Sequence, residues 1–124
     1  MTQFLDNFDR IKPGMTLERV VAVDESLTTF RTGTPVLSTP MMILLMEQVS
    51  AELADSLLPE NFTTVGYEVC IKHKAPARLG AQVKVQSKVL EADGRKVLFE
   101  VHVTEGDKVI GTGTHRRTAI STAR

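Results

Sequence analysis

An apolar helix between two prolines constrains the fold of this chain more than any other feature. Residues 41–46 read Met-Met-Ile-Leu-Leu-Met without a polar break, and they lie between Pro40 and Pro59. Thr39 suits the N-cap, and Pro40 suits the first helical position because its missing N–H would be unpaired there. A helix whose first turns are apolar on nearly all sides is typical of a central element. We therefore expect one central helix that begins at Thr39 and ends by Pro59.

Glu47 falls on the predicted buried side of this helix. At about 100° per residue, the inner arc combines one acid with apolar and small side chains. The arc consists of Ile43, Met46, Glu47, Ser50, Leu53, Ala54 and Leu57. A carboxylate removed from water is costly unless it is paired or hydrogen-bonded, which makes Glu47 a candidate for chemistry. The alternative is a residue at the edge of the arc whose long side chain reaches water.

After Pro59 the pattern changes from helical to alternating. One predicted face of the next strand ends at His73, and the other face includes Gly66 and Cys70. Turn sequences at Asp93-Gly94 and Gly106-Asp107 separate the following segments. We expect four successive antiparallel strands after the helix, and one earlier strand within residues 15–25.

A sheet with one apolar face, curled around a helix that is apolar on almost every side, satisfies both patterns. The sequence therefore predicts an α+β hotdog fold, in which an antiparallel sheet of about five strands wraps around one long central helix. No linker or low-complexity segment interrupts residues 1–124, so we expect a single domain. In the last strand Gly111 and Gly113 leave one face bare, where backbone, helix or ligand can approach closely.

Composition excludes several classes of function. The 124 residues carry 15 basic and 15 acidic side chains, and this balance, with few aromatic residues, argues against nucleic-acid binding. The longest apolar run is far shorter than the ~20 residues that span a bilayer, and no leader pattern is visible, so we expect no membrane association. The single cysteine, Cys70, fits a reducing, cytoplasmic location and is expected to be a buried or half-buried small side chain.

Three polar residues are candidates for catalysis. Thr39 brings a hydroxyl to the start of the helix, where free N–H groups and the helix dipole favour a developing negative charge. Glu47 supplies a carboxylate two turns further on, and His73 supplies an imidazole from a strand that must cover the helix. Each also has an ordinary structural interpretation, as a cap, an edge residue and a strand terminus. The pattern alone does not show that the three meet.

Metal and phosphate chemistry are not expected. The three histidines are far apart in sequence without helical ligand spacing, and the single cysteine has no partner. No glycine-rich loop joins a strand to a helix, so a phosphate-binding loop is also excluded.

Three segments together carry a resemblance to a known family. They are Leu37-Ser-Thr-Pro-Met-Met-Ile-Leu-Leu-Met-Glu47, Thr64-Val-Gly-Tyr-Glu-Val-Cys-Ile-Lys-His73 and Gly111-Thr-Gly-Thr-His-Arg-Arg117. Over nearly its whole length the chain resembles the acyl-CoA thioesterases of the hotdog superfamily, and more narrowly the fluoroacetyl-CoA thioesterase-like branch. The spacing of eight residues from Thr39 to Glu47, and of twenty-six from Glu47 to His73, agrees with the Thr, Glu, His triad of that branch.

The resemblance implies an enzyme that hydrolyses a small acyl-CoA to a free acid and CoA, without metal or other cofactor. It also implies a homodimer with sites near the subunit interface, and it leaves open whether two dimers form a tetramer. The Thr39 hydroxyl would then hydrogen-bond or attack, Glu47 would act as general base or nucleophile, and His73 would transfer protons. Gly66 lies in a family motif near the substrate carbonyl, where its backbone would act. Arg117 would pair with Glu47 or with a CoA phosphate, the alternative being a solvated charge at the end of a strand.

Two positions depart from the branch. Arg116 stands where relatives often carry an acidic residue, and Gly33 stands where an aromatic residue is associated with fluoroacetyl selectivity. We therefore expect a general acyl-CoA thioesterase rather than one selective for fluoroacetyl-CoA. The alternatives are a non-catalytic acyl-CoA-binding protein on the same fold and another hotdog reaction such as enoyl-CoA hydration, because a fold alone does not establish chemistry.

Overall fold

The computed structural model describes residues 8–31 and 33–123. Its elements, in chain order, are β1 (Thr16–Ala22), the 3-10 helix η1 (Glu25–Leu27), β2 (Thr28–Thr29), β3 (Val36–Leu37), α2 (Thr39–Asp55), β4 (Phe62–His73), β5 (Gln82–Asp93), β6 (Lys96–Glu105) and β7 (Lys108–Ser121).

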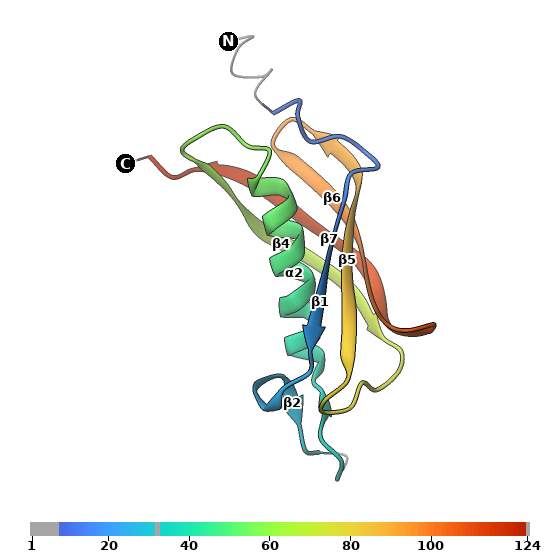
Figure 1. The fold of residues 1–124 in the computed structure, drawn as a ribbon. Coiled ribbons are helices and arrows are strands. Elements are labelled where there is room, and N and C mark those ends of the chain that lie inside the picture. Colours follow the sequence, from blue (N-terminus) through green and yellow to red (C-terminus); the bar gives the residue numbers. More distant parts are fainter. Residues whose placement is uncertain (1–7, 32, 124) are drawn as a thin grey trace.

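Five strands form one antiparallel sheet against a single long helix (Figure 1). The strand order is β1-β5-β6-β7-β4, and each neighbouring pair is antiparallel. Helix α2 lies along one face of the sheet and contacts all five strands. The arrangement confirms the predicted α+β hotdog architecture. Strands β2 and β3 pair separately, near the start of the helix.

The inner face of the sheet follows the predicted alternation in β5 and β6. Its side chains are at most 2% exposed, and burying one aliphatic or aromatic side chain of this kind contributes about 1.5–3 kcal/mol. They are Val83, Val85, Val89, Val97, Phe99, Val101 and Val103. One polar residue, Ser87, interrupts this row, and its hydroxyl lies 2.8 Å from the Ser50 hydroxyl of α2. The pair satisfies both hydroxyls inside the core.

Helix α2 is capped by Ser38 rather than by Thr39 as predicted. The Ser38 Oγ accepts a hydrogen bond from the Met41 backbone N–H at 3.3 Å. Thr39 and Ser38 are both good capping residues, and the backbone places Ser38 at the extended position that a cap requires. The Thr39 hydroxyl therefore does not cap the helix and is available for a hydrogen bond with another residue.

The buried arc of α2 is rotated relative to the predicted arc. Glu47 lies at its edge, with 37% of its side chain exposed, and so is half-buried rather than inside the core. The buried residues are Met42, Leu45, Met46, Val49, Ser50, Leu53 and Ala54.

A bulge in β4 changes the face of the sheet toward which the residues in the first half of the strand point. The register with β7 shifts around Tyr67, which is an extra residue in β4. Gly66 pairs with Arg117 and His73 pairs with Gly111, and these two partners lie on the same face of β7 because they are an even number of residues apart. The prediction that Gly66 points away from the His73 face is therefore wrong, because simple alternation does not anticipate an inserted residue.

Strand β4 also forms an uncovered edge of the sheet. Residues 65–70 are all exposed, and they include Val65 at 41%, Tyr67 at 46% and Val69 at 46%. Cys70 belongs to this segment and is exposed. The expectation that Cys70 is buried or half-buried is wrong because nothing in the described part of the chain covers this edge.

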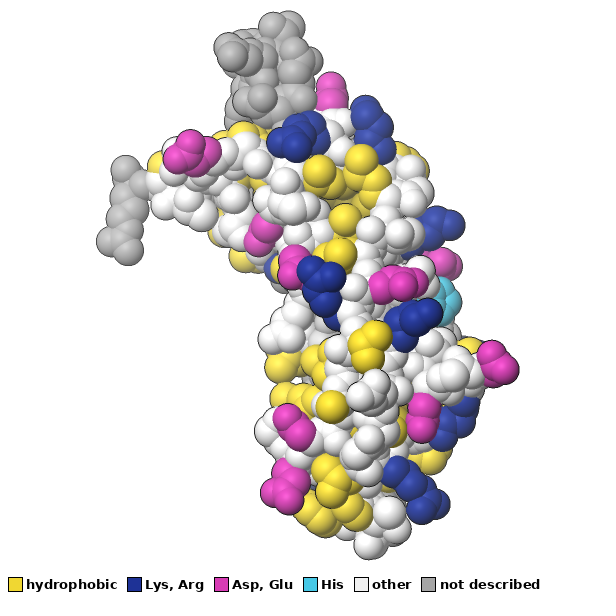
Figure 2. All heavy atoms as spheres, in the orientation of Figure 1, with side chains coloured by type: hydrophobic (Ala, Val, Ile, Leu, Met, Phe, Trp, Pro, Cys, Tyr) yellow, Lys and Arg dark blue, Asp and Glu magenta, His cyan; other side chains and the backbone are white. Residues whose placement is uncertain are grey.

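The surface carries mixed charge. On the face of the molecule drawn in Figure 2, positively and negatively charged side chains are interspersed, without a large region of one charge. Within the described ranges, no helix is long and apolar enough to cross a membrane.

Glycines in β7 permit close approach of neighbouring elements, as the sequence predicts. A Cβ at Gly111 would collide with the flexible side chain of Met42, whereas a Cβ at Gly113 would collide with the backbone carbonyl of Cys70. Methionine can move aside, but a carbonyl within a sheet cannot move without breaking its strand pairing.

We predict that Gly113→Ala lowers the free energy of unfolding by about 3 kcal/mol, whereas Gly111→Ala lowers it by about 1 kcal/mol. Urea unfolding followed by circular dichroism, at one protein concentration, measures both. Equal losses in the two variants would contradict the contact between Gly113 and the β4 backbone.

Candidate functional site

Thr39 and His73 form a hydrogen-bonded pair. The Thr39 Oγ1 lies 2.8 Å from the His73 Nδ1. Thr39 is the first residue of α2 and His73 is the last residue of β4, so the pair joins the two elements at one end of the helix. Both residues line a cavity of about 430 Å³.

The second ring nitrogen of His73 is unpaired. Burial lowers the pKa of His73, and the backbone of Ala75 raises it by a smaller amount. The imidazole is therefore mainly neutral at pH 7, and Nδ1 can accept the proton of the Thr39 hydroxyl. The Nε2 atom is buried and has no hydrogen-bond partner among the described residues. Leaving a buried polar atom unsatisfied costs about 1–3 kcal/mol, so Nε2 is a position where a further polar group would stabilise the site.

Glu47 lies in a different cavity, of about 290 Å³, which Gly66 and His115 also line. Its Oε1 is 3.9 Å from Nη1 of Arg117. A Cβ at Gly66 would lie 2.7 Å from Cε1 of His115, 3.1 Å from Oε1 of Glu47 and 3.2 Å from Nη1 of Arg117. The missing side chain of Gly66 is therefore what allows the carboxylate, the imidazole and the guanidinium to meet over the β4 backbone.

Arg117 is buried and held by several hydrogen bonds. Its Nε donates to Oγ1 of Thr64 at 2.8 Å, and its Nη2 donates to the Thr64 carbonyl at 2.9 Å. Burial lowers the pKa of Arg117, and the carboxylates of Glu47 and Asp55 oppose that effect, so the guanidinium remains charged. Arg117 is 8% exposed and is not a solvated charge at the end of a strand.

His115 is a site residue for which the sequence predicts no role. It is 1% exposed, with Nδ1 2.8 Å from the Glu68 carbonyl oxygen and Nε2 3.1 Å from Nη1 of Arg117. Burial lowers the pKa of His115, the Glu68 carbonyl raises it, the Arg117 charge lowers it further and the Glu47 charge raises it. The available sequence signal was the two-residue spacing of His115 and Arg117, which places both on one face of a strand.

The structure thus brings the predicted residues together in two groups. Eight residues of α2 separate Thr39 from Glu47, which is about 12 Å along the helix axis. Gly66 and His73 pair with residues of β7 that are six positions apart, which is about 20 Å along the strand. Thr39 meets His73, and Glu47 meets Gly66 and Arg117, but the two groups do not meet within one chain.

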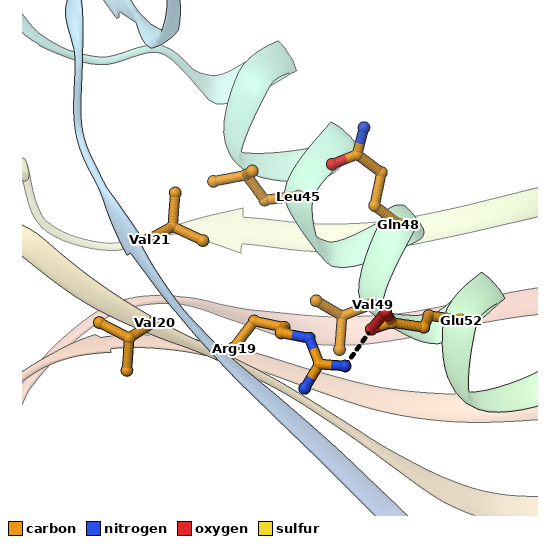
Figure 3. A pocket seen from close by; sticks show the side chains of 7 residues that line it. All are labelled: Arg19, Val20, Val21, Leu45, Gln48, Val49 and Glu52. Carbon is orange, nitrogen blue, oxygen red and sulfur yellow. Dashed lines mark ion pairs between the residues drawn. The ribbon is translucent and has the colours of Figure 1, made fainter.

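A third cavity, of about 260 Å³, lies between β1 and α2 (Figure 3). At its rim, Arg19 and Glu52 form an ion pair of 2.7 Å, with about half of each side chain exposed. The cavity contains none of the predicted site residues and no histidine. Within the described ranges, no group of three or more His, Cys, Asp or Glu residues is placed to hold a metal ion. The predicted catalytic residues Thr39, Glu47 and His73 lie instead in the first two cavities described above.

Comparison with known proteins identifies related sequences. Residues 16–123 match the profile of the family described as fluoroacetyl-CoA-specific thioesterase. The fluoroacetyl-CoA thioesterase of Streptantibioticus cattleyicolor is 29% identical over 85 residues, which are 68% of this chain and 61% of that protein. The chain therefore matches less than two thirds of the length of that relative.

Solved structures show the same fold. A hot-dog-like protein from Thermanaerovibrio acidaminovorans superposes with a TM-score of 0.86 at 26% identity, covering 94% of this chain and 89% of the other. The fluoroacetyl-CoA thioesterase FlK superposes with a TM-score of 0.83 at 23% identity, covering 90% of each chain.

His73 and His115 predict how stability depends on pH. Because folding lowers the pKa of His73 and of His115, the unfolded chain binds more protons than the folded chain as the pH falls below about 6.5. The contribution of these two neutral rings to the free energy of unfolding is fully present above that pH. It is lost as the pH decreases toward the lowered pKa values of the folded state. We predict that the free energy of unfolding falls between pH 7.5 and pH 5.5.

Urea unfolding at a series of pH values and at one protein concentration measures this dependence. His115→Gln removes one of the two titrating groups and should make the curve flatter. A wild-type curve that rises toward pH 5.5 would contradict the neutral state of both rings.

Proposed function

Because the chain belongs to the fluoroacetyl-CoA-specific thioesterase family, we propose that it is an acyl-CoA thioesterase that hydrolyses a small acyl-CoA to a free acid and CoA. Supporting this proposal are two groups of polar residues, each beside a cavity, in which a hydroxyl–imidazole pair and a carboxylate supply acid–base chemistry. The proposed reaction uses no metal or other cofactor.

We propose a homodimer in which each site takes residues from two chains. The buried Nε2 of His73, which lacks a partner among the described residues, is the observation that carries this proposal. Strand β4 is an uncovered edge, and two such edges can pair in antiparallel fashion around a two-fold axis. An axis near the middle of β4 brings the Gly66 end of one copy beside the His73 end of the other. Glu47 of the second copy then approaches the unpaired nitrogen.

Thr39, His73 and Glu47 of the second copy form the proposed catalytic group. In neutral His73, Nδ1 accepts a hydrogen bond from the Thr39 hydroxyl, and Nε2–H donates a hydrogen bond to the Glu47 carboxylate of the second copy. An oxygen nucleophile adds to the thioester carbonyl, the C–S bond breaks, and the CoA thiolate takes up a proton. Where the nucleophile is Thr39 or Glu47, water then hydrolyses the acyl-enzyme, which releases the free acid and restores the side chain. The nucleophile is Thr39, Glu47 or a water molecule from which Glu47 removes a proton. The first turn of α2 supplies backbone dipoles that stabilise the developing oxyanion.

Gly66 and Arg117 are the proposed substrate-binding residues. Gly66 and Glu47 line the same cavity of about 290 Å³, in which the thioester can lie against the β4 backbone. The Arg117 guanidinium is buried and bonded to Thr64, which favours pairing with Glu47 over contact with a CoA phosphate.

A general small acyl-CoA is the proposed substrate, rather than fluoroacetyl-CoA alone. Gly33 is exposed in the loop between β2 and β3 and supplies no side chain at the position where the resemblance associates an aromatic with fluoroacetyl selectivity. Thiol release from short, branched, aryl and long acyl-CoAs, with His73→Ala as the control, tests the activity and identifies the preferred acyl group. Saturable binding without thiol release would instead support a non-catalytic acyl-CoA-binding protein.

We predict that Glu47→Gln lowers kcat for the best substrate at least about 100-fold, because an amide neither accepts a proton nor attacks the carbonyl. The matched control is Glu52→Gln on the opposite side of the same helix, where loss of an exposed ion pair should change kcat less than about twofold. Equal unfolding midpoints would show that both variants fold. Turnover near the wild-type value in Glu47→Gln would remove that residue from the mechanism.

Mixing two inactive variants tests the shared site. A dimer that combines one Glu47→Gln chain with one His73→Ala chain has one site with both native residues and one site with neither. We predict that random pairing restores about a quarter of the wild-type activity, because half of the dimers are mixed and each has one intact site.

Chain exchange by co-refolding differently tagged variants, followed by thiol-release assays, measures this recovery. Light scattering should give a mass about twice that of the 13.7 kDa chain. No recovery from a mixture with confirmed mixed dimers would place both residues in the same chain's site.

A further inference from the structure

We propose that His115 is a positioning residue for this reaction: its imidazole fixes the Arg117 guanidinium in the orientation that presents Nη1 to the Glu47 carboxylate. The inference rests on the proposed function, and it assigns a task to a buried histidine that the catalytic group does not use. It follows from the hydrogen bonds around three side chains on the inner face of the sheet.

The Glu68 carbonyl determines the tautomer of His115. A carbonyl oxygen only accepts hydrogen bonds, so Nδ1, 2.8 Å away, carries the proton. In the neutral ring, Nε2 then has a lone pair, and Arg117 Nη1 donates to it at 3.1 Å. A protonated His115 would place an N–H opposite the guanidinium N–H groups, which repel it.

Arg117 is consequently held on three sides. Its Nε and Nη2 donate to Thr64, and one proton of Nη1 goes to His115. The Thr64 hydroxyl in turn donates to Oδ1 of Asp55 at 3.3 Å, which ties the guanidinium to the C-terminal end of α2. The second proton of Nη1 remains for the Glu47 carboxylate, whose Oε1 is 3.9 Å away.

Without the His115 acceptor, the two hydrogen bonds to Thr64 hold only the Nε–Nη2 edge of the guanidinium, and its plane can tilt about that edge. A guanidinium presents its donors in one rigid plane, so fixing Nε, Nη2 and Nη1 also fixes that plane. Glu47 is half-exposed and rests on Gly66, which offers no side chain to restrain it. The direction of its carboxylate therefore depends on Arg117, and catalytic groups need positions accurate to about 0.5 Å.

A double-mutant cycle tests the inference. His115→Leu removes the acceptor, and we expect kcat to fall about 10-fold with KM changed less than about twofold. His115→Gln keeps an amide oxygen as an acceptor and should retain at least about half of the wild-type kcat. In an Arg117→Met background, His115→Leu should change kcat less than about twofold, because the two residues act through one contact.

Independent losses that multiply in the double variant would overturn the inference and indicate a merely structural role for His115. A Gln variant as inactive as the Leu variant, with both folded, would also overturn it.

Imidazole nitrogen NMR of the wild-type protein tests the orientation without any turnover. We expect His115 to be neutral at pH 7.5 with its proton on Nδ1, and Arg117→Met to shift the Nε2 resonance. A proton on Nε2 would overturn the inference even if His115→Leu fails to fold. Absence of thiol release by the wild-type protein, by contrast, would overturn the proposed function, and with it the catalytic part of the inference.

Discussion

The close contact of helix α2 with strands β4 and β7 is the constraint on which the rest of the structure depends. Met42 packs over Gly111, and Glu47 lies over Gly66, so a side chain at either point would displace the end of the helix side chain that lies over it. Thr39 lies before this contact region of the helix, and there it reaches His73. The packing that closes the core therefore also sets the positions of the polar groups, and no separate loop is needed to hold them.

The bulge at Tyr67 makes β4 serve both groups of polar residues. In a strand of unbroken alternation, an inward His73 would turn Gly66 outward, since the two are an odd number of residues apart. The extra residue brings both onto the inner face, each opposite a residue on one face of β7. Bulges are frequent beside functional sites because they redirect side chains in this way. Here the bulge is what lets Glu47 and Arg117 approach the β4 backbone.

Strongly periodic elements of this fold could be predicted from the sequence, and features that depend on single-residue register could not. The apolar run of α2 and the alternation of β5 and β6 specify the core, because a change of face there would expose many apolar side chains. The cap at Ser38 and the exposure of Cys70 depend on local competition and on what covers an edge. The sequence suggests Thr39, Glu47 and His73 as polar residues near the helix, but their separation into two groups follows from how β4 runs beside α2.

Association of two copies through β4 would resolve two physical problems at once. An edge strand with six successive exposed residues, three of them large and apolar or aromatic, presents unpaired backbone groups that favour uncontrolled strand addition. Pairing with a second β4 satisfies those groups in a closed, two-fold arrangement and stops further growth. The same pairing carries a carboxylate toward the buried Nε2 of His73. Glu68 and Lys72 can remain on the outer face of the pair, where solvent screens them. In this arrangement, covering the edge and completing the catalytic group are one event, which explains how a chain can keep its acid–base groups about 12 Å apart along one helix.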